Sequence, residues 1–157
     1  MTDESYTYEN TIHVQAAPQQ VFEALTNADR LQRWFVSRAE TDPRPGGSFQ
    51  FAWEFADAAQ NGKQQGRFVE LVPGQKVSYT WEARPAPAEL TTVTFSVAPE
   101  AGGSRVSLAH TGFGTGEAGQ KARDYHAGPW DFYLSNLKAY LEAGQDNRAA
   151  VLGQKTA

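Results

Sequence analysis

The sequence predicts an α+β fold, in which one long C-terminal helix lies across a curved antiparallel sheet of about six strands, with two short helices after the first strand. Three observations lead to this prediction. Several segments alternate between apolar and polar residues, and short turns join them, as in an antiparallel sheet. The last segment repeats its apolar residues every three or four positions, which is typical of an amphipathic helix. A single sheet must bury its apolar face, and this helix carries the largest apolar stripe that could cover it.

The first strand and the two short helices are predicted from the N-terminal third of the chain. Residues 6–14 are mostly apolar at even positions and polar at odd positions, which indicates a half-buried strand. Pro18 then suits the first turn of a helix. The residues from Thr26 to Asp29 resemble a capping box, which predicts the start of a second short helix.

The middle of the chain predicts a run of strands. Residues 48–55 alternate most strongly, with four aromatic side chains on one face. Turn-forming residues, among them the stretch around Pro85 and Pro87, separate the later segments. The later strands are expected at residues 66–72, 76–82, 90–97 and 104–110.

The long helix is predicted from the pattern between Ala122 and Leu141, and Gly144 stands where a C-terminal glycine cap is expected. Pro129 inside this pattern should kink the helix or mark the start of its continuous part. We expect one domain over residues 1–144. Residues 145–157 show no periodicity, so we expect a frayed C-terminal tail.

Composition narrows the classes of function. The chain of 157 residues has no cysteine, which excludes disulfides and thiolate metal sites and favours a cytoplasmic location. A net charge of −4 argues against binding to nucleic acid. No apolar run approaches the roughly 18 residues that a membrane helix needs, so no membrane partner is expected.

Several segments carry a resemblance to a known family. They are Ile12 to Leu25 (IHVQAAPQQVFEAL), Leu31 with Trp34-Phe35, Pro45-Gly-Gly-Ser-Phe49, Thr80-Trp81, His110-Thr-Gly-Phe113, and Gly128-Pro-Trp130 with Leu134, Leu137 and Leu141. In this order they resemble the SRPBCC (START-like, helix-grip) superfamily, and more narrowly the activator of heat-shock-protein ATPase homologue 1-like family. The resemblance covers residues 6–143 and implies the helix-grip fold, which hosts lipid carriers, polyketide cyclases, aromatases and chaperone cofactors. The extra N-terminal domain of the eukaryotic chaperone activators is missing here, which argues against a chaperone as partner.

The inward faces of the predicted elements suggest a ligand cavity between the sheet and the C-terminal helix. Packing of a core explains most of these aromatic rows, but four aromatic residues in one strand exceed what a small core usually places in a row. The residues expected to line the cavity are Trp34, Phe51, Trp53, Tyr79, Trp81, Phe95, His110, His126, Trp130 and Tyr133.

Catalytic signatures are sparse. His110 shares its face with apolar neighbours and is a weak catalytic candidate, because a core-edge histidine bonded to a backbone group explains it better. No histidines share metal-ligand spacing, and no paired carboxylates lie on an apolar face, so no metal site is expected. Residues 114–119 match G-x-G-x-x-G, but no strand follows the helix, so we predict a flexible loop and no cofactor.

These observations favour a protein that binds a small apolar or aromatic molecule over an enzyme. The alternative is an enzyme resembling polyketide cyclases or dehydratases, in which His110 and Tyr79 polarise a carbonyl and the pocket folds the substrate. A chaperone-associated interaction module is a third hypothesis. A homodimer is also considered, formed through an edge strand such as that of residues 90–97.

Overall fold

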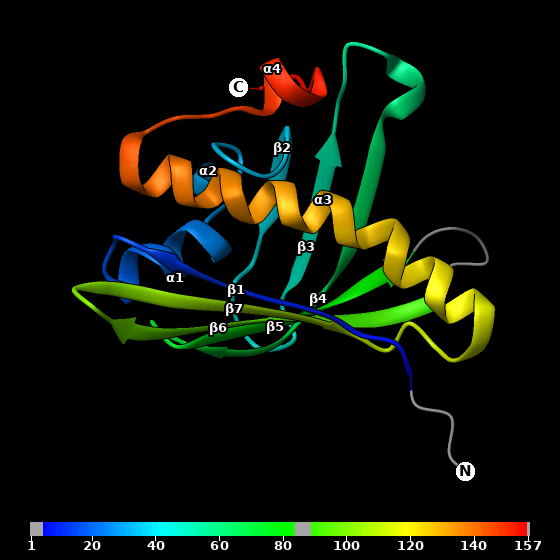
Figure 1. Ribbon diagram of the computed structural model, residues 1–157, viewed down its shortest axis with the longest axis horizontal. Coiled ribbons are helices and arrows are strands. Elements are labelled where there is room, and N and C mark those ends of the chain that lie inside the picture. Colours follow the sequence, from blue (N-terminus) through cyan, green and yellow to red (C-terminus); the bar gives the residue numbers. More distant parts are fainter. Residues whose placement is uncertain (1–4, 84–88, 157) are drawn as a thin grey trace.

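The computed structural model describes residues 5–83 and 89–156. Its strands are β1 (Tyr8–Val14), β2 (Arg38–Thr41), β3 (Ser48–Trp53), β4 (Gly62–Val72), β5 (Lys76–Ala83), β6 (Glu89–Glu100) and β7 (Gly103–Thr111). Its helices are α1 (Pro18–Thr26), α2 (Ala28–Leu31), the 3₁₀ turn η1 (Ala58–Gln60), α3 (Gly116–Ala143) and α4 (Arg148–Leu152). Within the described residues the strands form one antiparallel sheet in the order β1-β7-β6-β5-β4-β3-β2, and α3 crosses it (Figure 1).

The predicted α+β helix-grip architecture is confirmed, with one strand more than expected. The additional strand is β2, which has four residues and pairs with β3. Its sequence, RAET, is too short and too polar to show a period of two. The predicted stretch around Pro85 and Pro87 lies outside the described residues.

The expectation that residues 90–97 form an edge strand is wrong. These residues belong to β6, which pairs with β5 on one side and with β7 on the other. Because β1 pairs with β7, the described sheet ends at β1 and β2 instead. Any pairing with a second copy along a sheet edge would therefore have to use one of those two strands.

Side chains from the two neighbouring strands, β3 and β5, pack closely against Gly66 in β4. A Cβ atom there would lie 2.4 Å from Thr80 Oγ1 and 2.9 Å from the ring of Phe49. The absence of a side chain lets the Phe49 ring pack across β4. A register shift between Phe68 and Glu70 follows at the pairing with β5, and bulges of this kind increase local twist.

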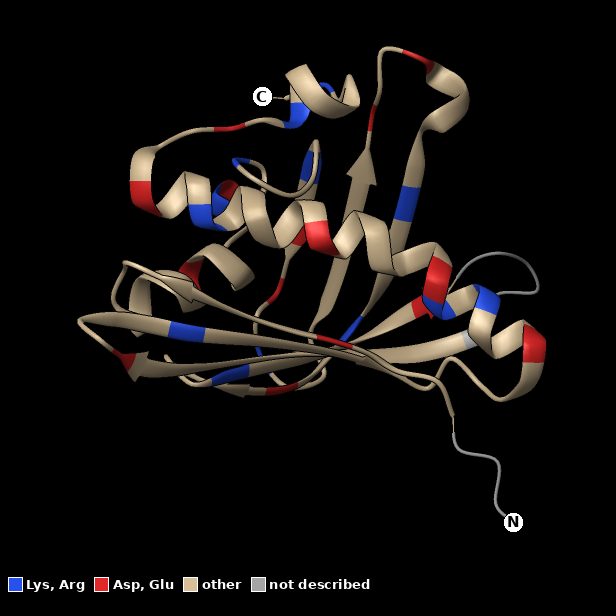
Figure 2. Cartoon of the chain, viewed as in Figure 1, with Lys and Arg blue, Asp and Glu red and all other residues tan. Residues whose placement is uncertain are grey.

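Helix α3 is a single helix with Pro129 in its interior. The sequence predicts that Pro129 kinks the helix or marks the start of its continuous part. Gly144 ends it as predicted, with a φ of +66° that suits glycine. Acidic and basic residues are interspersed along α3 (Figure 2), including the ion pairs Lys121–Glu117 and Lys138–Glu142. None of the helices in the described residues is long and apolar enough to cross a membrane.

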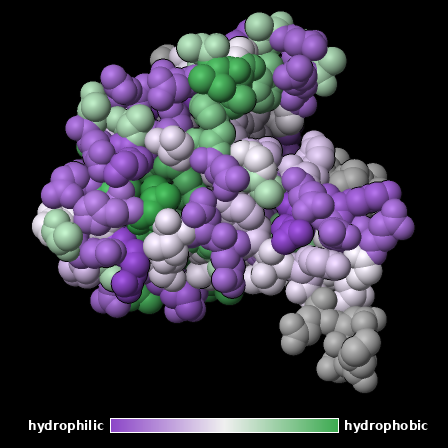
Figure 3. Space-filling model, in the orientation of Figure 1, coloured by the Kyte–Doolittle hydropathy of each residue, from purple (hydrophilic) through white to green (hydrophobic). Residues whose placement is uncertain are grey.

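The C-terminal segment differs from the frayed tail that the sequence predicts. It folds back as α4, and the Arg148 guanidinium is buried and donates to the carbonyl oxygens of Val36 and Gln32 at 2.8 Å each. Gln154 bridges to Phe55 beside β3. Polar side chains hold this segment, so apolar periodicity gave no sign of it. Figure 3 shows hydrophobic atoms at the surface over α4, where Val151 is 63% exposed.

Candidate functional site: an aromatic groove

An open groove of about 1750 Å³ lies between α3 and the half of the sheet formed by β2, β3 and β4. Its wall also receives Trp81 from β5 and Leu152 from α4, so segments far apart in the sequence meet there. Its aromatic lining residues are Phe35, Phe51, Trp53, Phe55, Trp81, Tyr125, Trp130, Phe132 and Tyr133. A concave surface with this many rings has the character of a site for an apolar or aromatic molecule.

Phe35 lies at the centre of the ring cluster beneath the groove. Its ring stacks on that of Trp130, with centroids 5.5 Å apart and an interplanar angle of 25°. It meets Trp53 and Tyr133 edge-on at 5.4 and 5.1 Å. Phe35 is almost fully buried, whereas Trp53 is only partly buried. The groove is therefore the open side of a cluster that is otherwise packed as a core.

The polar atoms of His110, beside this cluster, are all bonded within the protein. Trp130 Nε1–H donates to His110 Nδ1 at 3.0 Å, so the ring proton belongs on Nε2. Nε2 lies 2.7 Å from the hydroxyl of Thr91, which in turn donates to the Trp81 carbonyl at 2.7 Å. Burial, with a smaller effect of the neighbouring His126, lowers the pKa of His110 to about 3. This histidine is neutral at physiological pH and joins β7 to α3.

His126 differs from His110 because one of its nitrogens faces no described partner. Its Nδ1 lies 2.8 Å from the Ala122 carbonyl one helical turn earlier and donates to it. Nε2 is then an acceptor with no hydrogen-bond partner among residues 5–83 and 89–156. Burial lowers the pKa of His126, against the opposing effect of the Ala122 carbonyl. Because His126 lines the groove, it offers a neutral acceptor there.

The end of the groove beside α4 is held by hydrogen bonds. Tyr133 donates its hydroxyl to Gln154 Oε1 at 2.6 Å, and Gln154 Nε2 donates to the Phe35 carbonyl at 3.1 Å. Burial raises the pKa of Tyr133, so its hydroxyl stays protonated. The C-terminal segment thus fixes Tyr133 and Phe35 relative to each other.

Two carboxylates, Glu54 at the rim of the groove and Asp131 on α3, are held by neighbouring side chains. Glu54 at the rim is bound by Arg38 at 2.8 Å. Asp131 of α3 accepts hydrogen bonds from the hydroxyl of Tyr8 and, at 3.3 Å, from Asn10. Burial and this contact with Asp131 raise the pKa of Tyr8 to about 12. Among the described residues, no three His, Asp or Glu side chains gather closely enough to hold a metal ion.

The structure separates the ten residues expected to line a cavity into two sets. Six of them line the groove: Phe51, Trp53, Trp81, His126, Trp130 and Tyr133. The other four lie in the packed core and do not line it: Trp34, Tyr79, Phe95 and His110. Trp34, for example, donates its indole N–H to the Ala24 carbonyl at 2.8 Å, which fastens it beneath α1. Burial raises the pKa of Tyr79, whose ring packs on Phe49 at 5.1 Å.

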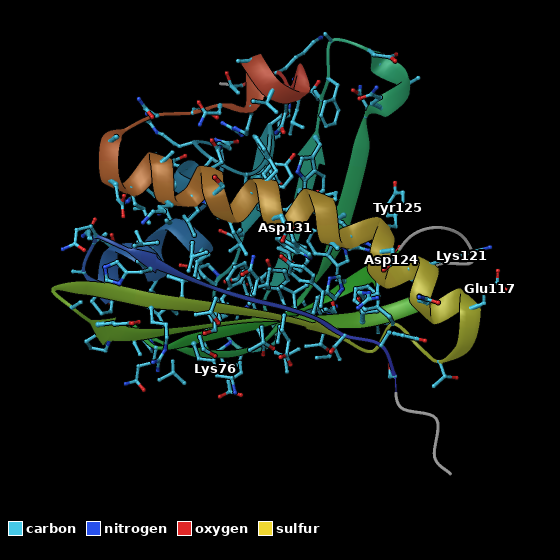
Figure 4. All side chains as sticks on the ribbon, viewed as in Figure 1. Lys76, Glu117, Lys121, Asp124, Tyr125 and Asp131 are labelled. Carbon is cyan, nitrogen blue, oxygen red and sulfur yellow. The ribbon has the colours of Figure 1, made fainter. Side chains whose placement is uncertain are left out.

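Many residues that line the groove were missing from the sequence-based set, among them Phe35, Tyr125 and Gln64. Phe35 adjoins Trp34 in an irregular turn, where parity does not tell which of the two rings faces the groove. Tyr125 projects outward from α3 (Figure 4) and is 59% exposed. Gln64 lies in the part of β4 that precedes the predicted strand, and its side chain bonds both backbone groups of Glu82. In the sequence, the pair Trp34-Phe35 was the one sign that Phe35 could belong to the site.

Comparisons with solved structures show where this architecture recurs. Protein CV1439 from Chromobacterium violaceum is 25% identical, with a TM-score of 0.73, and the match covers 87% of this chain and 96% of that one. The Aha1 dimer from Colwellia psychrerythraea is 20% identical, with a TM-score of 0.69 and coverage of 89% and 98%. CalU16 from Micromonospora echinospora is 20% identical, with a TM-score of 0.65 and coverage of 92% and 88%. A search of curated proteins gave no match.

Protein-family models give a match that extends over most of the chain. Residues 15–142 match the model described as Activator of Hsp90 ATPase homolog 1-like protein. The matched span runs from the end of β1 to the end of α3 and includes nearly all of the groove. The chain belongs to the family of Activator of Hsp90 ATPase homolog 1-like proteins.

Proposed function

We propose that this protein binds a small apolar or aromatic molecule in the groove between α3 and strands β2 to β4. The observation that carries the proposal is the aromatic wall, in which the partly exposed ring of Trp53 joins a buried cluster around Phe35. Burial of aromatic surface supplies most of the binding energy of such sites, and a few polar groups orient the ligand. His126 and the indole of Trp81 are polar groups of this kind on the wall.

Binding is favoured over catalysis by the geometry around His110. The enzyme hypothesis uses His110 and Tyr79 to polarise a substrate carbonyl, yet both His110 nitrogens are engaged with Trp130 and Thr91. A group that is already bonded on both sides has no free donor for a substrate. The aromatic rings and the few polar groups that line the groove suit recognition of a ligand.

We also propose that the protein forms a homodimer. Its support is the solved relative from Colwellia psychrerythraea, which is described as a dimer, together with the sheet ends at β1 and β2. Sedimentation equilibrium at high micromolar concentration tests it, and a monomer mass there would exclude it.

Titration calorimetry with a panel of fatty acids, flavonoids and polycyclic aromatic compounds tests the binding proposal. The variant Trp53→Ala removes one partly exposed ring of the wall and should weaken binding about tenfold, which corresponds to about 1.4 kcal/mol. The matched control is Val69→Ala, which removes a 54% exposed side chain outside the groove and should leave affinity unchanged. Absence of binding across the panel, or equal loss in both variants, would contradict the proposal.

A further inference from the structure

We propose that the ligand of the groove presents a hydrogen-bond acceptor, such as a ketone oxygen, to the indole N–H of Trp81. The inference rests on the proposed binding function and adds the chemical class of the ligand. It starts from one atom: Trp81 Nε1 is buried and has no hydrogen-bond partner among residues 5–83 and 89–156. It is the one buried side-chain nitrogen or oxygen in that part of the chain for which this holds.

Other tryptophans of the same protein show what a buried indole N–H normally does. Trp34 donates to the Ala24 carbonyl at 2.8 Å, and Trp130 donates to His110 Nδ1 at 3.0 Å. Both are as deeply buried as Trp81. Buried polar groups are almost always paired, so an unpaired donor on a residue that lines the groove points to an external partner.

Among the described residues, aromatic rings surround Trp81. Its ring centroid lies 5.8 Å from that of Trp53 and 5.7 Å from that of Trp130, and both rings also line the groove. The nearby hydroxyl of Thr91 already donates to the Trp81 carbonyl and contacts His110. An unpaired buried donor destabilises the protein, and an acceptor atom of a bound ligand would satisfy it.

These features define the ligand class. A flat aromatic body matches the wall formed by Trp53 and Trp130, because offset and edge-to-face ring contacts are favourable there. The acceptor should be uncharged, since burial of an anion among rings costs far more than burial of a neutral carbonyl. Aromatic ketones and quinones combine both properties. Purely hydrocarbon ligands would leave the N–H unpaired and should bind less tightly.

The probe pair 9-fluorenone and fluorene tests this inference, because the two tricyclic molecules differ by a carbonyl in place of a methylene. Calorimetry on the wild-type protein should find fluorenone bound about tenfold more tightly. Trp81→Phe keeps an aromatic ring and removes the N–H, so this preference should disappear. The control Trp53→Phe alters a ring whose N–H is in a partly exposed side chain, and should weaken both probes while keeping their ratio.

A second measurement serves if Trp81→Phe does not fold. In ¹H–¹⁵N spectra of the wild-type protein, fluorenone should move one indole N–H signal downfield, and fluorene should not. Equal affinity for the two probes, or a preference that survives Trp81→Phe, overturns the inference while the groove remains a binding site. If neither probe binds, the proposed function fails for polycyclic aromatic ligands and this inference fails with it.

Discussion

The two halves of α3 are held to the sheet in different ways. In the half before Pro129, the buried residues are Gly119, Ala122 and His126, which offer little apolar surface. In the half from Trp130 onward, the buried residues are Trp130, Tyr133, Leu134, Asn136 and Leu137. The ends differ too: Thr115 makes no side-chain cap at the start, whereas Gly144 caps the end with backbone bonds to Ala139 and Tyr140.

The groove lies at the junction between these two halves of α3. His126, Gly128, Pro129 and Trp130 all line it, so its helical wall lies where the lightly held half meets the firmly held half. Pro129 lacks an N–H and removes the helix hydrogen bond to the Tyr125 carbonyl at this boundary. A site built this way can have one rigid wall and one wall that opens at small cost.

The largest effect is expected from breaking the anchor of the second half. Asn136 donates to the Trp34 carbonyl and to Asp146, and Asp146 in turn binds Arg148, whose side chain is 1% exposed. Arg148→Met would leave carbonyl groups and Asp146 without their donor and should lower the free energy of unfolding by about 3–5 kcal/mol. Urea unfolding measures this.

The exposed Arg105→Met serves as the control for that experiment and should leave the unfolding midpoint nearly unchanged. A midpoint for Arg148→Met equal to that of the control would show that the C-terminal segment does not anchor α3.

Acidification should loosen the junction through His110, the partner of Trp130. The unfolded chain takes up a proton near pH 6.5, whereas the folded protein does so only near the lowered pKa of about 3. Stability therefore rises with pH across this window, and about 2 kcal/mol should be lost between pH 7 and pH 5. Burial of His126 acts in the same direction.

Urea unfolding at both pH values checks this loss. Carboxyl groups titrate at about pH 4, below the measured interval from pH 7 to pH 5. His110→Gln has no ring to protonate and should show a smaller loss, whereas equal pH dependence in the two proteins would refute the assignment to His110.

The fold was largely predictable because alternation and helical periodicity report apolar faces. Parity on β7 correctly placed His110 inward, where it is fully buried. Parity could not tell a filled core from a groove, because Phe95 and Trp53 both obey it and only the second borders the open space. The two residues differ in whether distant segments of the chain cover their side chains.

The parts that were missed depend on polar contacts. Arg148 and Gln154 are buried through hydrogen bonds to backbone carbonyls, and neither belongs to an apolar repeat. The start of α2 shifted for a similar reason, since the cap that accepts from Arg30 N is Asn27, whereas Thr26 bonds back to Phe22. Local hydrogen bonds of this kind shift the start of a helix by one or two residues, and a sequence pattern cannot locate a helix boundary that finely.

Hydrogen exchange measures the difference between the two halves directly. Amides of residues 117–127 should exchange about tenfold faster or more than those of residues 132–142, because fewer large side chains hold them. A ligand bound in the groove should slow the first set more than the second. Equal protection of both halves in the free protein would mean that α3 moves as one unit and that the groove has no opening wall.

The smallest effect is expected from Gly128→Ala, which stabilises the lightly held half without adding a contact. A Cβ atom at Gly128 would meet no atom within 4 Å outside its chain neighbours, so the change reduces the freedom of the unfolded chain. Because the Pro129 ring disfavours helical backbone at a preceding residue that carries a Cβ, the net gain should stay below about 0.5 kcal/mol. Exchange in residues 117–127 should slow while residues 132–142 stay unchanged. Gly119→Ala is the matched control, because its Cβ would lie 2.2 Å from the Gly114 carbonyl oxygen and should destabilise the same half. If Gly128→Ala instead slowed exchange throughout α3, the two halves would open together, and Pro129 would not divide them.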